Sequence, residues 1–169
     1  MESFLNHAKT ELDVLWGKRK SQDEKTQYLT GEYFKWIQKK TKIISNEKEF
    51  SIPSDIQIQR GSVFWIDFGF NIDEEFGGKH PAIVLRKGSR TTIVVPLSTQ
   101  EPTEEQLQSG IYVPIKKVYG FKDIPRWVNI LNTTPISIQR YDFSSKPGNI
   151  KGWELDKLNE SIKKSGLWR

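Results

Sequence analysis

The chain has 169 residues, with 26 lysines and arginines against 21 aspartates and glutamates, which gives a formal net charge of +5 at neutral pH. This length fits one ordinary domain, or a domain of about 110 residues with an appendage, and it excludes a large multidomain enzyme. The sequence contains no cysteine, which excludes disulfide frameworks, thiolate zinc sites and cysteine nucleophiles.

The positive charge is spread evenly along the chain, because residues 1–50 hold 10 basic and 8 acidic side chains and residues 51–169 hold 16 and 13. A solvated surface explains this distribution, and nucleic-acid binding is also compatible with it. No run of about 18 apolar residues is present, and charged residues interrupt the apolar positions of the N-terminus. We therefore expect a cytoplasmic protein that does not associate with membranes.

The first 50 residues have the periodicity of two amphipathic helices. Apolar residues recur at spacings of one, three and four between Phe4 and Trp16 and again between Tyr33 and Ile44, with a break over residues 18–23. This pattern predicts a helical hairpin that forms an N-terminal extension over residues 1–50. Because neither helix buries its apolar face alone, the hairpin must pack on itself, on the downstream domain or on a second chain.

A linker is predicted over residues 51–59, and from residue 60 the periodicity changes to that of β-strands. Short apolar runs predict six strands, over residues 62–68, 82–85, 91–97, 111–115, 128–131 and 136–140. The turns between them favour a small antiparallel barrel over alternating βαβ units. This barrel domain spans residues 60–169 and includes a C-terminal helix, which apolar residues at helical spacing predict over residues 153–164.

The side chains offer few catalytic options. His7 and His80 are the only histidines, and two histidines without a cysteine do not predict a metal site. The adjacent Asp73, Glu74 and Glu75 form either a solvated turn or a divalent-ion site, and no glycine-rich phosphate loop is present. His80 stands between a two-glycine turn and a predicted strand, where it suits either a structural role or proton transfer near neutral pH.

Four blocks of the sequence resemble the MazF/PemK toxin family in their order and spacing. They are Arg60–Gly69 (RGSVFWIDFG), Glu75–Leu85 (EFGGKHPAIVL), Val94–Gln100 (VVPLSTQ), and Pro135–Arg140 (PISIQR) with Gly148–Gly152 (GNIKG) and the terminal helix. The resemblance covers about residues 60–165. It implies a fold that is mainly β with helices, a small SH3-like or CcdB-like antiparallel barrel with a C-terminal helix.

Membership of this family would also imply a function. The family's barrels form homodimers, cleave single-stranded RNA without a metal or other cofactor, and are neutralised by an antitoxin protein. We therefore expect an endoribonuclease of toxin type that cuts mRNA. The 2′-hydroxyl would attack the phosphate and leave 2′,3′-cyclic phosphate and 5′-hydroxyl ends.

The family's active site, carried over position by position, corresponds to His80, Ser98 and Glu75. The family loop usually reads Gly-x-Arg-Pro where this chain has Gly78–Pro81, so His80 replaces the catalytic arginine. Ser98 replaces a threonine, with Thr99 as the equivalent if the register shifts by one, and Glu75 matches an acidic residue of the first loop.

These replacements are compatible with RNA cleavage. A histidine can take or give the required proton and, when charged, can bind the phosphate, so His80 predicts a stronger pH dependence than arginine would. Serine keeps the hydroxyl of threonine. We assign His80 as general acid or base and phosphate contact, Ser98 as hydroxyl donor to the phosphate, and Glu75 as base or orienting group. Structural roles at a strand end for Ser98 and in a solvated turn for Glu75 stay open.

Aromatic and basic side chains interleave over residues 116–127, a pattern that suits unstacked bases and their phosphates. The RNA-binding residues that we predict are Lys79, Thr99, Phe76, Lys116, Lys117 and Arg126. Trp127 is expected in the core, because it opens an apolar run.

Other functions are compatible with the same sequence. The missing loop arginine fits a catalytically weakened barrel that serves as an RNA-binding or protein-binding module. Action on DNA gyrase, as in the related CcdB toxins, fits less well because the sequence blocks are MazF-like. The N-terminal helices lie outside the resemblance, and we expect packing or dimerisation from them, ahead of restraint over an RNA groove or binding of a partner.

Overall fold

The structure of the chain, a computed structural model, describes residues 1–166. It contains two compact units, one from Met1 to Asn46 and a second that begins at Glu47. Within the described residues, no helix combines the length and the apolar character needed to cross a membrane.

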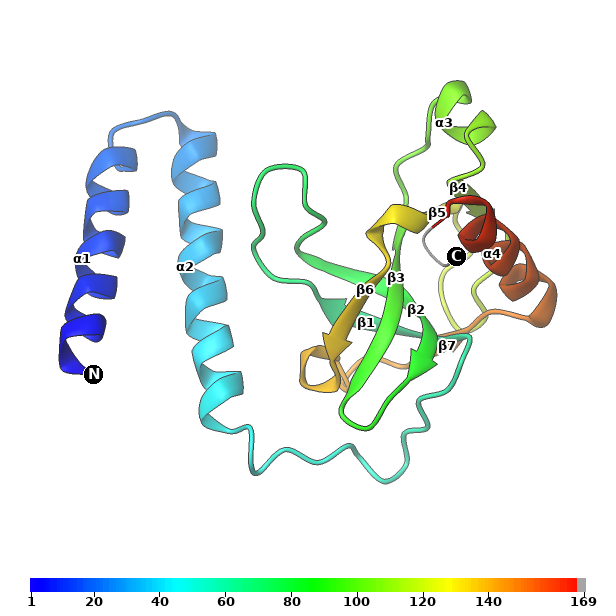
Figure 1. Ribbon diagram of the computed structural model, residues 1–169, viewed down its shortest axis with the longest axis horizontal. Helices are drawn as coiled ribbons and strands as arrows, with labels where there is room; N and C mark the ends of the chain where they lie inside the picture. The colour runs from blue at the N-terminus through cyan, green and yellow to red at the C-terminus, as the bar shows by residue number, and fades with distance from the viewer. Residues whose placement is uncertain (167–169) are drawn as a thin grey trace. The chain divides into compact units, whose positions relative to one another are not determined.

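The first unit is the predicted helical hairpin, formed by α1 (Glu2–Arg19) and α2 (Glu24–Ser45) (Figure 1). The second helix begins where Asp23 caps it, because the Asp23 side chain accepts a hydrogen bond from the Thr26 amide at 3.1 Å. The rings of Trp16 and Phe34 join the two helices at a centroid distance of 6.4 Å. Thr30 is the only residue of either helix that is fully buried, so the hairpin has little core of its own.

The second unit is a curled antiparallel sheet that forms a half-barrel, as predicted (Figure 1). Its strands are β1 (Ser62–Asp67), β2 (Lys79–Lys87), β3 (Thr91–Ser98), β4 (Tyr112–Ile115), β5 (Arg126–Asn129), β6 (Thr134–Ser137) and β7 (Gly148–Asn149). They pair in the order β4-β5-β3-β2-β1-β7, with β6 also paired to β3. The predicted C-terminal helix is α4 (Gly152–Lys164).

The observed elements differ from the predicted ones at several ends. The runs predicted as strands over 128–131 and 136–140 end in short 3-10 turns, η1 (Ile130–Asn132) and η2 (Ile138–Arg140). Side chains of Asn129 and Ser137 start these turns by accepting backbone hydrogen bonds two residues later. The short helix α3 (Glu104–Gln108) and the two-residue strand β7 were not predicted.

The core has two parts because alternate residues of β1, β2 and β3 point to opposite faces of the sheet. The first face buries Val63, Ile83, Val95 and Leu97 together with Leu158 of α4. The second face buries Phe64, Ile66, Ala82, Val84 and Val94 together with Ile136, Ile138 and Tyr141. We call these the α4 face and the β6 face. The alternation also decides on which side the residues at the strand ends lie.

Residues 47–59, which include the predicted linker, lie against the barrel. Phe50, Ile52 and Ile56 pack on the core of the β6 face, and Ile58 is 5% exposed. The Arg90 guanidinium donates a hydrogen bond to the Glu47 carbonyl at 2.8 Å. This segment therefore contributes to the barrel's core as well as leading into it.

Candidate functional site

His80 lies near the start of β2, after a turn that needs glycine at positions 77 and 78. Gly78 has a φ of +79°, and its amide donates to the Gly69 carbonyl at 2.7 Å. A Cβ on Gly77 would lie only 2.9 Å from that same Gly69 carbonyl oxygen. Both positions therefore require glycine, for backbone conformation and for space respectively. The turn fixes the place at which β2 begins.

The His80 ring is half-buried beside aromatic carbon. It pairs in register with Ile66 of β1, which puts it on the β6 face, and its centroid lies 4.7 Å from that of Phe76. Burial lowers the pKa of His80 from the ordinary value of 6.5. The imidazole is therefore neutral at pH 7 and has a free nitrogen lone pair that can accept a proton.

A groove of about 630 Å³ opens beside His80, and we call it the His80 groove. It is lined by Trp65, Lys79, His80, Pro81, Leu97, Thr99, Gly120, Phe121, Lys122, Ile124, Arg126, Ser145 and Lys146. The rings of Trp65 and Phe121 stack in it at 6.1 Å with an interplanar angle of 16°. Aromatic faces of this kind suit the bases of a single strand.

The basic residues of the His80 groove divide into bound and open ones. Lys79 Nζ lies 2.6 Å from the Asp142 carboxylate, and this bond and those from Ser144 and Ser145 hold the pKa of Asp142 well below its usual range. Arg126 is only 6% exposed, and it donates to the carbonyls of Lys122 and Ile124 at 2.9 and 3.2 Å. The Arg126 side chain is thus turned away from solvent and holds the loop that precedes β5.

Besides the paired Lys79, the His80 groove has two exposed lysines, Lys122 and Lys146. They come from different loops, one before β5 and one before β7. These two residues are therefore the cations best placed for a polyanion.

The end of β3 brings two hydroxyls close to His80. The β2–β3 ladder ends at the pair Ala82–Pro96, and alternation from the buried Val94 puts Ser98 on the β6 face, the face of His80. Ser98 lines a smaller depression of about 180 Å³, and its Oγ accepts a hydrogen bond from the Gln100 amide at 3.0 Å. Thr99 lines the His80 groove itself. Ser98 thus closes the strand end on the face of His80, and Thr99 shares the His80 groove.

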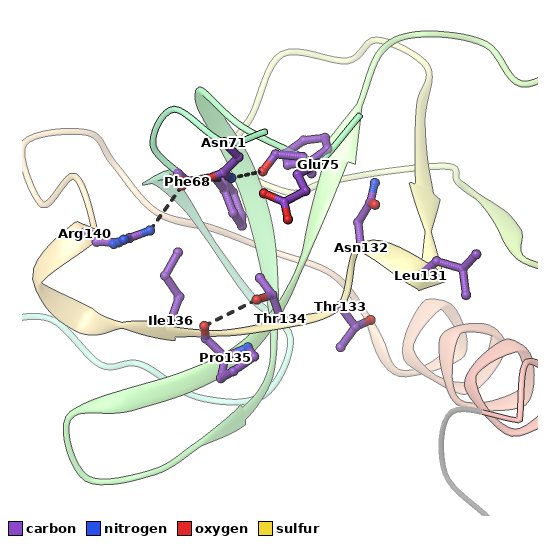
Figure 2. A pocket seen from close by; sticks show the side chains of 11 residues that line it. Phe68, Asn71, Glu75, Leu131, Asn132, Thr133, Thr134, Pro135, Ile136 and Arg140 are labelled. Atoms are coloured by element: carbon purple, nitrogen blue, oxygen red, sulfur yellow. Dashed lines mark hydrogen bonds between the residues drawn. The ribbon is translucent and has the colours of Figure 1, made fainter. Parts of the chain in front are cut away.

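Glu75 lies in a third depression, away from the His80 groove. Figure 2 shows this depression, which we call the Glu75 pocket and which has a volume of about 440 Å³. The Glu75 carboxylate accepts a hydrogen bond from the Ile72 amide at 3.1 Å. Phe76 borders both the Glu75 pocket and the Ser98 depression and contacts the His80 ring. The Glu75 pocket and the Ser98 depression therefore meet at Phe76, which also contacts His80 of the His80 groove.

Two of the predicted RNA-binding residues lie elsewhere. Lys116 Nζ lies over the Trp153 ring at 5.7 Å, and Lys117 Nζ lies over the Tyr119 ring at 5.4 Å. Neither lines the His80 groove. Trp127, predicted in the core, is half-buried and lines the Ser98 depression.

Sequence reasoning missed Trp65 and Lys146 as groove residues. Trp65 could have been found, because alternation along β1 places it on the α4 face, beyond the end of the core. No signal marks Lys146, which lies in an ordinary turn. Within residues 1–166, no group of three or more histidine, aspartate or glutamate side chains is placed to hold a metal ion.

Comparison with known proteins assigns the barrel to a family. The family described as PemK-like, MazF-like toxin of type II toxin-antitoxin system matches residues 59–165. The chain belongs to this toxin family. The match includes every residue of the three depressions and excludes the N-terminal helices. No curated protein sequence matches the chain.

Solved structures of toxins are similar to the barrel of this family member. MazF from Deinococcus radiodurans has a TM-score of 0.51 at 14% identity, over 68% of this chain and 100% of that chain. An endoribonuclease in complex with its cognate antitoxin from a mycobacterial species has a TM-score of 0.46 at 19% identity, over 67% and 100%. A toxin of Mtb has 0.42 at 20%, over 51% and 91%. The likeness to MazF shows a shared fold.

Proposed function

We propose that this toxin-family protein is an endoribonuclease that cleaves single-stranded RNA, with the 2′-hydroxyl as internal nucleophile and without a metal ion. The observation that carries the proposal is His80, whose neutral imidazole lies beside a groove with stacked aromatic rings and exposed lysines. Family membership supports the same reaction.

In this mechanism the RNA backbone lies along the His80 groove. Lys122 and Lys146 attract its phosphates, and Trp65 offers a face on which a base can stack. The ion pair of Lys79 with Asp142 neutralises much of that lysine's charge, so Lys79 contributes less than its position before His80 suggests.

The chemical step begins when His80 takes the proton of the 2′-hydroxyl. The 2′-oxygen attacks phosphorus, the bond from phosphorus to the 5′-oxygen breaks, and the leaving oxygen takes up a proton from water or a groove cation. Hydroxyls at the end of β3, from Ser98 and Thr99, donate hydrogen bonds to the charge that grows on the phosphate. The products are a 2′,3′-cyclic phosphate and a 5′-hydroxyl. Glu75 has no step in this mechanism, because it lies in a depression that neither His80 nor Ser98 lines.

Substitution of the two histidines tests the role of His80. A mixed-sequence RNA is incubated with the wild type, His80→Ala and the matched control His7→Ala, whose histidine lies on the exposed surface of α1. Loss of a general base predicts a fall in rate of about 10²- to 10⁴-fold for His80→Ala and no change for His7→Ala. Full cutting by His80→Ala contradicts the mechanism. Tight RNA binding by the wild type without any cutting favours the binding-module alternative instead.

Two further variants assign the hydroxyl. Ser98→Ala and Thr99→Val each remove one hydroxyl, and the larger loss of cleavage identifies the donor to the phosphate. We expect a loss of about 10²-fold for that donor, in the range for a single hydrogen bond to a transition state. Equal and small losses of cleavage in both variants would show that neither hydroxyl at the end of β3 takes part in the reaction.

We also propose an antitoxin protein as partner and a homodimer as the working form. The family's place in type II toxin-antitoxin systems supports the antitoxin. Light scattering on the full chain measures the oligomer, and a monomeric mass contradicts the dimer.

A further inference from the structure

The Glu75 pocket has no step in the proposed reaction, although it adjoins the residues that do. Its aromatic wall consists of Phe68, which is 4% exposed, and Phe76, with ring centroids 5.2 Å apart and nearly perpendicular. The same Phe76 ring contacts His80, with the ring centroids 4.7 Å apart. A molecule in the pocket is thus separated from His80 by one side chain.

The loop that carries Glu75 is held in place by backbone hydrogen bonds. The Asn71 side-chain amide donates to the Phe76 carbonyl at 2.6 Å, and the Glu75 amide donates to the Ile72 carbonyl at 3.0 Å. The Asn71 amide also donates to the Phe68 carbonyl at 3.4 Å. Asn71 therefore shapes the pocket, and the other polar side chains offer contacts to a ligand.

The polar side chains that line the pocket besides Asn71 are Glu75, Asn132, Thr133, Thr134 and Arg140. Figure 2 shows the Glu75 carboxylate pointing into the space that Asn132 and Thr134 border. Arg140 closes one end, where it donates to the Phe68 carbonyl at 3.2 Å and lies near the charge of Asp67.

These groups define the kind of ligand that fits. An ionised carboxylate only accepts hydrogen bonds and repels a phosphate, and the charge of Arg140 is engaged by the Phe68 carbonyl and Asp67. We therefore expect the part of an RNA that enters to be a base with donors at its edge. Single-stranded RNA presents its Watson–Crick edges for such contacts. Guanine has two adjacent donors on this edge, N1–H and the 2-amino group, and they match the two oxygens of one carboxylate.

The other three bases match less well. Adenine and cytosine place an acceptor beside their single amino donor, and uracil has one donor between two acceptors. In each case the carboxylate of Glu75 would meet a lone pair. The O6 acceptor of guanine can instead receive a hydrogen bond from the Asn132 amide.

We propose that the Glu75 pocket binds a guanine base of single-stranded RNA, close to the phosphate at which His80 acts. This inference rests on the proposed function for its substrate class and deepens it by assigning a base-reading residue. Glu75 selects the base and takes no part in proton transfer.

The test uses RNA that cannot be cut. Six-nucleotide 2′-O-methyl oligonucleotides that carry one guanine, adenine, cytosine or uracil in a uracil background are titrated with the full chain, and fluorescence anisotropy gives the affinity. We expect guanine to bind roughly tenfold more tightly than the other bases, the scale of one good bidentate contact.

A pair of neighbouring variants isolates Glu75. In Glu75→Gln the side chain keeps an acceptor for the Ile72 amide but loses one acceptor toward the ligand, so the guanine preference should fall below about twofold. Glu74→Gln removes the same charge from an adjacent exposed residue that does not line the pocket, and it should keep the preference.

Equal affinity for all four bases, or an unchanged guanine preference in Glu75→Gln, overturns the inference. Guanine-selective binding by a protein that cuts no RNA contradicts the proposed reaction and leaves this pocket assignment standing. RNA cleavage by a protein that binds all four bases equally would contradict the pocket assignment and leave the proposed reaction standing.

Discussion

Gly148 of β7 is the position at which a single methyl group should do the most damage to the groove. A Cβ on Gly148 would lie 2.6 Å from Phe121 Cδ1 and 2.7 Å from the Tyr119 carbonyl oxygen, about 1 Å inside ordinary contact. The Tyr119 carbonyl cannot move away freely, because it accepts the Asn149 amide at 3.0 Å and the Tyr119 amide donates back at 2.8 Å.

The expected cost follows from these contacts. Overpacking a well-packed site costs about 1–3 kcal/mol, and weakening the two backbone hydrogen bonds adds about 1 kcal/mol. We therefore expect Gly148→Ala to lower the free energy of unfolding by about 2–4 kcal/mol. With a urea dependence of about 2 kcal/mol per molar for a small protein, the denaturation midpoint falls by roughly 1–2 M.

Urea denaturation followed by near-ultraviolet circular dichroism measures this midpoint. The matched control is Gly152→Ala at the first residue of α4, where a Cβ meets no atom within 4 Å and the change should stay within about 0.5 kcal/mol. Equal midpoints for the two variants would refute the reasoning, because they would mean that the contact between β7 and the Phe121 loop is not tight.

The remaining predictions concern buried polar groups. Tyr141→Phe should lower the free energy of unfolding by about 1–2 kcal/mol, because the Thr92 hydroxyl, 2.7 Å from the Tyr141 hydroxyl, loses its buried partner; an unchanged urea midpoint would contradict this. Glu154→Ala should cost about 2 kcal/mol, since Glu154 is 1% exposed and accepts the Lys116 amide at 2.8 Å, and a more stable variant would contradict it. The rate of RNA cleavage should level off on the alkaline side of the His80 pKa, which burial lowers below 6.5, and should fall as the pH drops through that pKa. The rate of a protein that needs protonated His80 would rise in that range.

Much of the barrel was predictable because its strands alternate between two buried faces. The apolar runs around Phe64, Ile83 and Val95 located β1, β2 and β3. The helix α3 carried a readable signal as well, since Thr103 and Gln106 form a reciprocal cap at its start.

Other elements had no local signal. The strand β7 consists of Gly148 and Asn149, and it forms only because β1 and Tyr119 lie beside it. Asn129 and Ser137 end their strands because their side chains accept hydrogen bonds from backbone amides two residues later. The apolar runs continue past both residues, so the sequence pattern does not show where the strands end.

The site was predictable in part, for the same reason. His80 and Ser98 could be picked out by resemblance, and their positions follow from strand alternation. The separation of Glu75 from the His80 groove, and the inward turn of Arg126, depend on how loops fold back on the sheet. The hydrogen-bond partners that decide this, such as the Ile124 carbonyl, are backbone groups that no residue type reveals.

In the proposed reaction the 2′-hydroxyl of the RNA attacks the neighbouring phosphate, and the ends of the products test this most directly. The full chain is incubated with a mixed-sequence RNA in the presence of EDTA, and both new termini are identified. The mechanism predicts 2′,3′-cyclic phosphates and 5′-hydroxyls, formed by the wild type and His7→Ala and almost absent with His80→Ala. Ends with a 5′-phosphate, or cutting that EDTA abolishes, would contradict it.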